Sequence, residues 1–304
     1  MLADLRTVLF HTARIGGASN LDFLFLVPSI HRQRYAGEVN AGEYPATAAL
    51  TTGYVFRVEN EAMVYYLQSV GRTGHLTNLH VTPPVKRIFP LNSIPTEALP
   101  RTAYILGILL TLAVIPTLVL IQDYWALVTL SMWILARLMS VLVTQSRTVM
   151  GWKGVPEPGV EGDLLTLLSQ DRWVRMQGLV DDLKAVTSGH WMRDETAFES
   201  FILSVATFLI YASIAVSSLV SMEGNLLLAG LLVLSTGLLG LCNAWTSEFR
   251  IYDRVVRMVG EPKPYARRRQ MADELIAETK RHDWAVGLGL IPVPSGESGT
   301  SATM

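Results

Sequence analysis

The sequence is poor in charge over long stretches. Charged side chains make up 17% of the 304 residues, against about a quarter in an average soluble domain. The shortage is local, because several long runs carry no charge while the other segments have an ordinary composition. This distribution is typical of a membrane protein with water-facing parts.

Cysteine is almost absent as well. The single cysteine, Cys242, lies in an apolar run, so an internal disulfide framework and a CxxC metal site are excluded. The sequence also contains no Asn-x-Ser/Thr glycosylation site. Both absences fit water-facing parts that stay in the cytosol.

The familiar catalytic signatures are missing too. The sequence has no GxSxG, GxxxxGK[ST], HExxH or GxGxxG motif. A net charge of −1 gives no reason to expect a nucleic-acid partner. No cofactor is predicted from these patterns.

Four apolar runs are long enough to cross a bilayer. They cover residues 103–121, 124–145, 201–220 and 226–245. Spanning needs about 20 helical residues. Only Gln122 and Asp123 separate the first pair, and residues 221–225 separate the second. The sequence therefore predicts two helical hairpins with short turns.

Arg137 interrupts the second run. The stretch 124–136 would cover roughly 20 Å as a helix, too little to cross the membrane, so the helix must continue through Arg137 to about residue 145. A charge inside a span is a functional candidate by default. We expect Arg137 to point inside the bundle towards the nearer interface. The polar groups expected at that depth or at the rim are Asn243, Tyr211, Glu248 and Glu199.

The basic residues indicate the orientation. Of 25 Lys and Arg residues, none lies in the two turns and one lies in a span. The others lie before the first span, between the second and third spans, or after the fourth. By the positive-inside rule, both termini are predicted to be cytosolic. Spans of this length slightly favour the endoplasmic reticulum among organelles.

The predicted cytosolic part is built from three regions. Residues 1–100 are β-rich, with strands expected near 53–58, 62–70 and 76–81 and a buried or interface-dipping segment at 21–30. Residues 146–198 hold a strand or hairpin to about 177 and then a helix to about 187; a helix over 171–187 is the alternative. Residues 248–292 are expected to be helical, continuing from the last span, and 293–304 disordered. The predicted fold is a mainly α membrane protein with four transmembrane helices in two hairpins and a small α+β cytosolic part.

Four stretches of the sequence resemble a known family. They are FPLNSIP (89–95), MGWKGVPEPGVEGDLL (150–165), LSQDRWVRMQGLVDDLKAVTSG (168–189) and GEPKPYARR (260–268). They are similar to predicted fungal multi-pass membrane proteins with no assigned activity, and the likeness covers most of the chain, Arg137 included. The resemblance implies a fungal source and carries over no site residues.

Three groups of candidate site residues stand out. The membrane-buried polar group comprises Arg137, Asn243 and Tyr211. A candidate site at the cytosolic interface comprises Arg172, Asp181, Asp182, His190 and Trp191. Arg267, Arg268 and Arg269 oppose the dipole of a predicted helix, which makes them candidates for anionic lipid headgroups. No metal site is predicted, since His75 and His80 would lie on opposite faces of a strand.

The sequence is compatible with three functions. The favoured one is a non-catalytic, membrane-anchored scaffold or adaptor with its working surface in the cytosol. The alternatives are a membrane enzyme acting on lipids or secondary metabolites, and a small transporter or channel. The predicted partners are the lipid bilayer with its anionic headgroups, and a cytosolic protein or a second copy of the chain.

Overall fold

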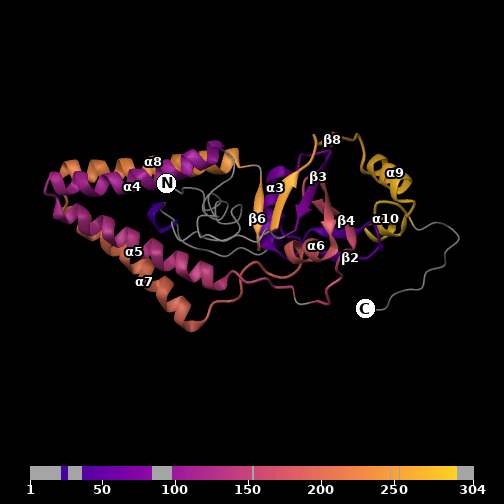
Figure 1. The fold of residues 1–304 in the computed structure, drawn as a ribbon, viewed down its shortest axis with the longest axis horizontal. Helices are drawn as coiled ribbons and strands as arrows, with labels where there is room; N and C mark the ends of the chain where they lie inside the picture. The colour runs from indigo at the N-terminus through magenta and orange to yellow at the C-terminus, as the bar shows by residue number, and fades with distance from the viewer. Residues whose placement is uncertain are drawn as a thin grey trace. The chain divides into compact units, whose positions relative to one another are not determined.

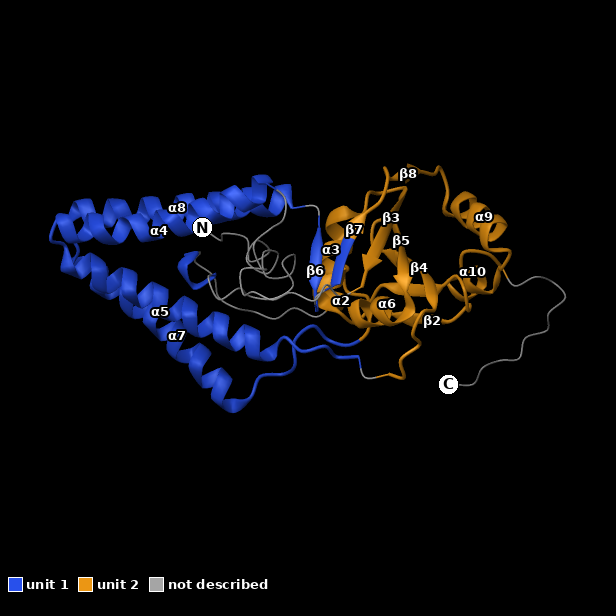
Figure 2. Cartoon of the chain, viewed as in Figure 1, with its two compact units in different colours: residues 1–34, 84–153, 189–256 blue, residues 35–83, 154–188, 257–304 orange. Residues whose placement is uncertain are grey.

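The chain forms two compact units. The computed structural model describes residues 22–26, 36–83, 98–152, 154–246, 248–252 and 254–292. The helical unit contains residues 1–34, 84–153 and 189–256, and the sheet unit contains residues 35–83, 154–188 and 257–304 (Figure 2). Each unit is thus assembled from three segments that lie far apart in the sequence.

Within the part of the chain that the structure describes, four helices of the helical unit are long and apolar enough to cross a membrane, as the sequence predicts. They are α4 (Ala98–Leu120), α5 (Tyr124–Arg147), α7 (Ala197–Val216) and α8 (Met222–Trp245), with the 3-10 turn η3 (Ser217–Leu219) extending α7. The chain connects them as two hairpins. The second turn is shorter than expected, because the Ser221 hydroxyl accepts a hydrogen bond from the Gly224 N–H and starts α8 within the predicted turn.

The helices pack between hairpins more than within them. α4 lies along α8, and α5 lies along α7 (Figure 1). The two pairs meet at the end that holds the turns and separate towards the other end (Figure 1). Leu118, Ala126 and Leu228 belong to the apolar cluster that joins the pairs. The turns set the order of the helices, and side-chain packing sets which helices become neighbours.

One carboxylate joins the two turns. Asp123 accepts a hydrogen bond from the Ala126 N–H at 3.0 Å, which caps α5. Its other oxygen accepts from the Ser221 N–H at 3.0 Å and from the Ser221 hydroxyl at 2.5 Å. A Cβ at Gly224 would lie 2.2 Å from this oxygen, so the approach requires glycine there.

We expect Asp123→Ala to lower the free energy of unfolding by about 2 kcal/mol, because it removes a helix cap and the tie between hairpins. Thermal unfolding of the full chain in detergent measures this loss. Glu223→Ala, an exposed acid in the same region, is the control and should change little. Equal losses in the two variants would contradict the role of Asp123.

The contact between the turns also predicts a pH dependence, because the Ser221 hydrogen bond lowers the pKa of Asp123. The stabilisation should therefore persist above pH about 4 and fade as pH falls through that lowered pKa.

The sheet unit has a mixed sheet. Its strands are β1 (Ala46–Ala49), β2 (Val55–Arg57), β3 (His75–Thr82), β4 (Glu161–Leu168), β5 (Arg172–Leu179) and β8 (Lys263–Pro264). Five of them lie in the order β2-β1-β4-β5-β3, and β8 pairs with β3. Neighbours are antiparallel except β3 and β5, which are parallel. The unit also contains α2 (Ala36–Val39), α3 (Glu61–Val70), α6 (Val180–Thr187), α9 (Arg268–Thr279) and α10 (Asp283–Gly287).

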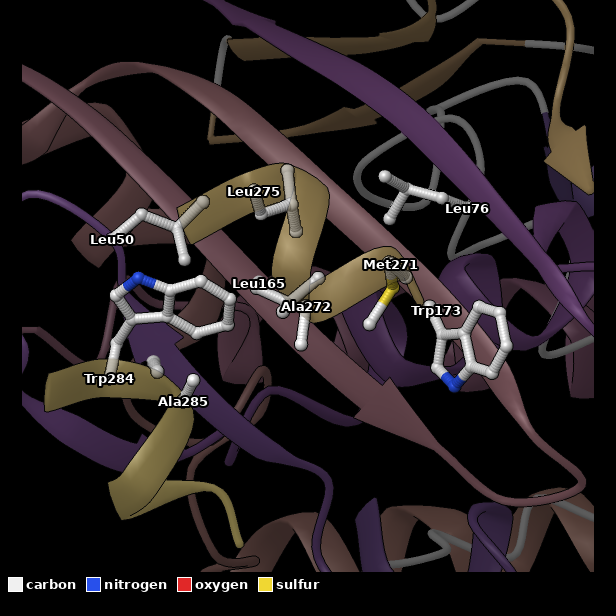
Figure 3. Close-up of a cluster of buried hydrophobic side chains, with 10 residues drawn as sticks. Leu50, Leu76, Leu165, Trp173, Met271, Ala272, Leu275, Trp284 and Ala285 are labelled. Atoms are coloured by element: carbon white, nitrogen blue, oxygen red, sulfur yellow. The ribbon is translucent and has the colours of Figure 1, made fainter. Parts of the chain in front are cut away.

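One hydrophobic core of this unit lies between the sheet and the helices α9 and α10. Figure 3 shows Met271 and Leu275 of α9 and Trp284 of α10 facing strand residues such as Leu165 and Trp173. Trp284 is fully buried, and its indole N–H donates to the Arg281 carbonyl at 2.9 Å. This apolar contact fixes the C-terminal segment of the chain on the sheet.

Two sequence predictions are wrong. Residues 62–70 form helix α3 instead of a strand, because Asn60 caps the Met63 N–H at 3.0 Å and apolar residues recur at helical spacing. The segment after α8 is not helical. It forms the antiparallel hairpin of β6 (Phe249–Ile251) and β7 (Arg254–Met258), with β7 crossing the boundary between the units. In β6, the buried Phe249 and Ile251 alternate with the less buried Arg250, which is the strand pattern.

Other expectations agree with the structure. β2 and β3 lie at predicted strands, and β4, β5 and α6 form the favoured hairpin followed by a helix that ends at Thr187. The hairpin turns through the three residues 169–171, and the positive φ angles of Gln170 and Asp171, 61° and 53°, suit a short hairpin loop. The predicted proline-rich approach at 84–97 and the tail at 293–304 lie outside the described residues.

Candidate functional site

The helical unit buries a small polar cluster among its apolar helices. It consists of Asp22 in the 3-10 turn η1 (Asp22–Leu24), Tyr104 on α4 and Arg137 on α5. Their exposed fractions are 3%, 0% and 9%. η1 contacts both α4 and α5. Three segments that are distant in sequence therefore meet at one buried point.

Hydrogen bonds define the geometry of this cluster. The Tyr104 hydroxyl donates to a carboxylate oxygen of Asp22 at 2.6 Å. The Arg137 Nε donates to the main-chain carbonyl of Asp22 at a longer 3.4 Å. The opposite charges of Asp22 and Arg137 also attract each other. A lone acid and a lone base, each within an apolar run, thus share one site.

The residues after η1 fill the space between the helices. The Phe25 ring stacks on Tyr104 with centroids 5.7 Å apart. A Cβ at Gly107 would lie 2.3 Å from the Phe25 ring, so glycine makes room for it. Leu26 joins the apolar cluster that includes Leu118. Backbone that is not helical is tolerated at membrane depth only where protein surrounds it, and both residues are buried here.

The partner of Arg137 differs from the expected ones. Arg137 is inside the bundle, but its hydrogen bond within the described residues goes to the main-chain carbonyl of Asp22. Tyr211 was expected in the interior and instead lies 61% exposed on α7, which packs along α5 by one face only. Glu199 pairs with Arg193, and Glu248 pairs with Arg250. Asn243 is buried on α8.

Asp22 and Tyr104 were missed by the sequence analysis. The signal for Asp22 was available, since it is the single charge in the apolar stretch LDFLFLVPSI (21–30). It is the same kind of signal that singled out Arg137. Pairing an isolated acid with an isolated base in apolar runs would have predicted their contact.

The five residues predicted at the cytosolic interface do not form one site within either unit. Arg172 begins β5, and Asp181 and Asp182 follow its other end, so the length of the strand separates them. His190 and Trp191 belong to the helical unit. Arg172 donates to Gln68, and Asp181 accepts from the Glu157 N–H at 2.8 Å. These contacts are of the kind that stabilise a folded unit.

The predicted headgroup-binding arginines are partly matched by acids. Arg267 precedes α9. Arg268 forms an ion pair with Asp171, and Arg269 lies 3.9 Å from Asp273 one turn along the helix. These contacts explain how basic side chains are accommodated at the start of a helix, and they reduce the charge that is left for lipid.

Comparisons with known proteins do not add a family. No family model, no curated protein and no solved structure matches the chain. The resemblance to fungal membrane proteins therefore stays a prediction. Within the residues that the structure describes, no three His, Cys, Asp or Glu side chains gather closely enough to hold a metal ion.

Proposed function

We propose that the protein is a membrane-anchored scaffold or adaptor of fungal origin. Its four long apolar helices serve as the anchor, and both termini and the sheet unit face the cytosol. The basic residues on the segments between and around the helix hairpins support this orientation. The proposal needs a surface of the sheet unit that is preformed and open to a partner.

Strand β2 is the surface that supports the proposal best. It is the edge strand of the described sheet and pairs with β1 along one side. Tyr54 precedes it with 69% of its side chain exposed, and its ring stacks on Phe56 with centroids 6.0 Å apart. Exposed tyrosine is a common anchor in protein interfaces, and an open edge strand can pair with an extended peptide.

The loop that leads into β2 is held in place. Arg281 donates to the main-chain carbonyls of Thr51 and Thr52 at 3.0 and 3.1 Å. Arg281 also pairs with Asp283. Gly53 has a φ of 80°, and a Cβ there would collide with Asp283. A partner would therefore meet an edge that is already ordered, which lowers the entropy cost of binding.

Proximity labelling in intact cells tests the scaffold proposal. The full chain carries the labelling enzyme, and the proteins it labels are compared between the wild type, Tyr54→Ala and Val155→Ala. Val155 is 81% exposed in the same unit and controls for a general surface change. We expect labelling of one or more cytosolic proteins to fall about tenfold in Tyr54→Ala alone, since a central tyrosine is commonly worth more than a tenfold change in affinity. Labelling no higher than that of an unrelated four-span protein would refute the proposal.

A further inference from the structure

Arg137 is largely buried, and the described residues use only part of its hydrogen-bonding capacity. Its side chain is 9% exposed, and its one hydrogen bond within the described residues uses Nε at the long distance of 3.4 Å. The N–H groups on both Nη atoms have no partner among those residues. Among the residues that the structure describes, this guanidinium is therefore short of acceptors, and a further acceptor at its Nη atoms would offset part of the cost of burying its charge.

The position of Arg137 restricts what that group can be. Arg137 lies ten residues before Arg147, the end of α5, which places it roughly 15 Å along the helix from that end. The Phe25 ring stacks on Tyr104 of the cluster, and both rings are almost completely buried. A ligand here would have a polar head at the arginine and apolar neighbours around it.

We propose that Arg137 binds the oxyanion head of an anionic amphiphile taken from the membrane. The planar fork formed by the two Nη groups matches the paired oxygens of a carboxylate or a phosphate. Either head can come from a membrane component, a fatty acid in the first case and an anionic phospholipid in the second. The site is distinct from the β2 edge and does not depend on the scaffold proposal.

The Asp22 carboxylate limits how much negative charge a bound head group can carry at this site. Its carboxylate is bonded to the Tyr104 hydroxyl at 2.6 Å and faces the same cluster as the guanidinium. Among the described residues, the cluster carries one positive and one negative charge, so a bound head with a single negative charge fits better than one with two. The Asp22 carboxylate therefore weakens anion binding while its main-chain carbonyl orients the arginine.

The test uses the full chain reconstituted in nanodiscs. The discs contain phosphatidylcholine alone, phosphatidylcholine with oleate, or phosphatidylcholine with phosphatidic acid, and a further sample receives inorganic phosphate. Native mass spectrometry of the released protein measures how much of each molecule stays bound. We expect oleate or phosphatidic acid to be retained by the wild type, and which one is retained identifies the source of the head group.

Two variants and one control distinguish a loss of amphiphile binding from a loss of folding. Arg137→Gln should reduce the retained amphiphile about tenfold or more, whereas Arg101→Gln, at an exposed arginine of α4, should leave it unchanged. Asp22→Asn keeps an acceptor for Tyr104 and the main-chain carbonyl but removes the competing charge. It should tighten binding about fivefold, a gain that a purely structural role would not produce.

Several outcomes would overturn the proposal. Equal retention by the wild type and Arg137→Gln is one, and retention of no amphiphile in any disc is another. Binding of inorganic phosphate without retained amphiphile would place the ligand in water and not in the membrane. Weaker binding in Asp22→Asn would also count against it, because the carboxylate would then be a binding group. If Arg137→Gln does not fold, the Asp22→Asn result alone decides.

Discussion

Arg175→Ala should lower the free energy of unfolding of the sheet unit by about 3 kcal/mol. Arg175 is 9% exposed on β5. Its guanidinium makes paired hydrogen bonds to Asp163, at 2.6 Å from Nη2 and 3.0 Å from Nε, and to Glu278 at 2.8 and 2.9 Å. Removing it leaves the largely buried Asp163 carboxylate without this partner. The expected loss is at the lower end of the range for a broken buried ion pair. Glu278 is about half exposed, so water screens its interaction with Arg175.

Hydrogen exchange of the full chain in nanodiscs measures this loss in α9. Glu278 lies on α9, so the helix should lose protection about a hundredfold in Arg175→Ala. Arg268→Met is the control, because it removes an exposed ion pair at the other end of α9. Protection that falls equally in both variants would show that the buried position of Arg175 is unimportant.

The same contact predicts a pH dependence. The hydrogen bonds from Arg175 lower the pKa of Glu278 below its ordinary value. A carboxyl whose pKa is lower in the folded state stabilises the fold above its unfolded pKa of about 4.3. This stabilisation should be lost as pH falls through the lower folded pKa. Protection of α9 that does not change between neutral and acidic pH would contradict the contact.

Gly107→Leu should displace the segment that lies between the helices of the helical unit. Even a Cβ at this position would come within 2.3 Å of the Phe25 ring, which is 1% exposed and stacked on Tyr104. Overpacking of this kind costs about 1–3 kcal/mol, more than the roughly 1 kcal/mol that leucine gains over glycine in a helix. We expect a lower unfolding temperature and faster hydrogen exchange at residues 22–26.

Gly240→Leu provides the matched control. Among the described residues, no atom lies within 4 Å of a Cβ built at Gly240 on α8. The same substitution there should leave the unfolding temperature unchanged or raise it. Should Gly107→Leu behave like Gly240→Leu, Phe25 would not occupy the place that the structure gives it.

The failures of the sequence analysis share a physical cause. EAMVYYLQSV (61–70) combines strand-forming residues with helical spacing, and the Asn60 cap with burial against neighbouring residues favours the helix. Residues 249–258 were assigned to a helix because they follow one, although Phe249 and Ile251 alternate with Arg250 as in a strand. Local preference was weak in both segments, and tertiary packing decided the outcome.

The polar cluster around Arg137 was likewise predicted only in part from the sequence. The sequence indicated that Arg137 needed a polar neighbour inside the bundle, since a lone charge in a long apolar run has few other solutions. Asp22 is the single charge of another apolar stretch, but it is 115 residues away and outside any predicted span, so its contact with Arg137 is not among the predictions. Depth along a helix can be counted from the sequence, but the segment that enters between two helices is set by packing.

The sequence by itself determined the number, position and hairpin connection of the four apolar helices, because spanning length and freedom from charge are properties of each segment alone. It also favoured the β4–β5 hairpin over a helix, because the turn is local, but it did not decide between them. Only the tertiary structure decided that α4 lies along α8, that α5 lies along α7, and that Asp22 and Tyr104 meet Arg137. Those pairings depend on how side chains from distant segments fit together, and no single segment carries that information.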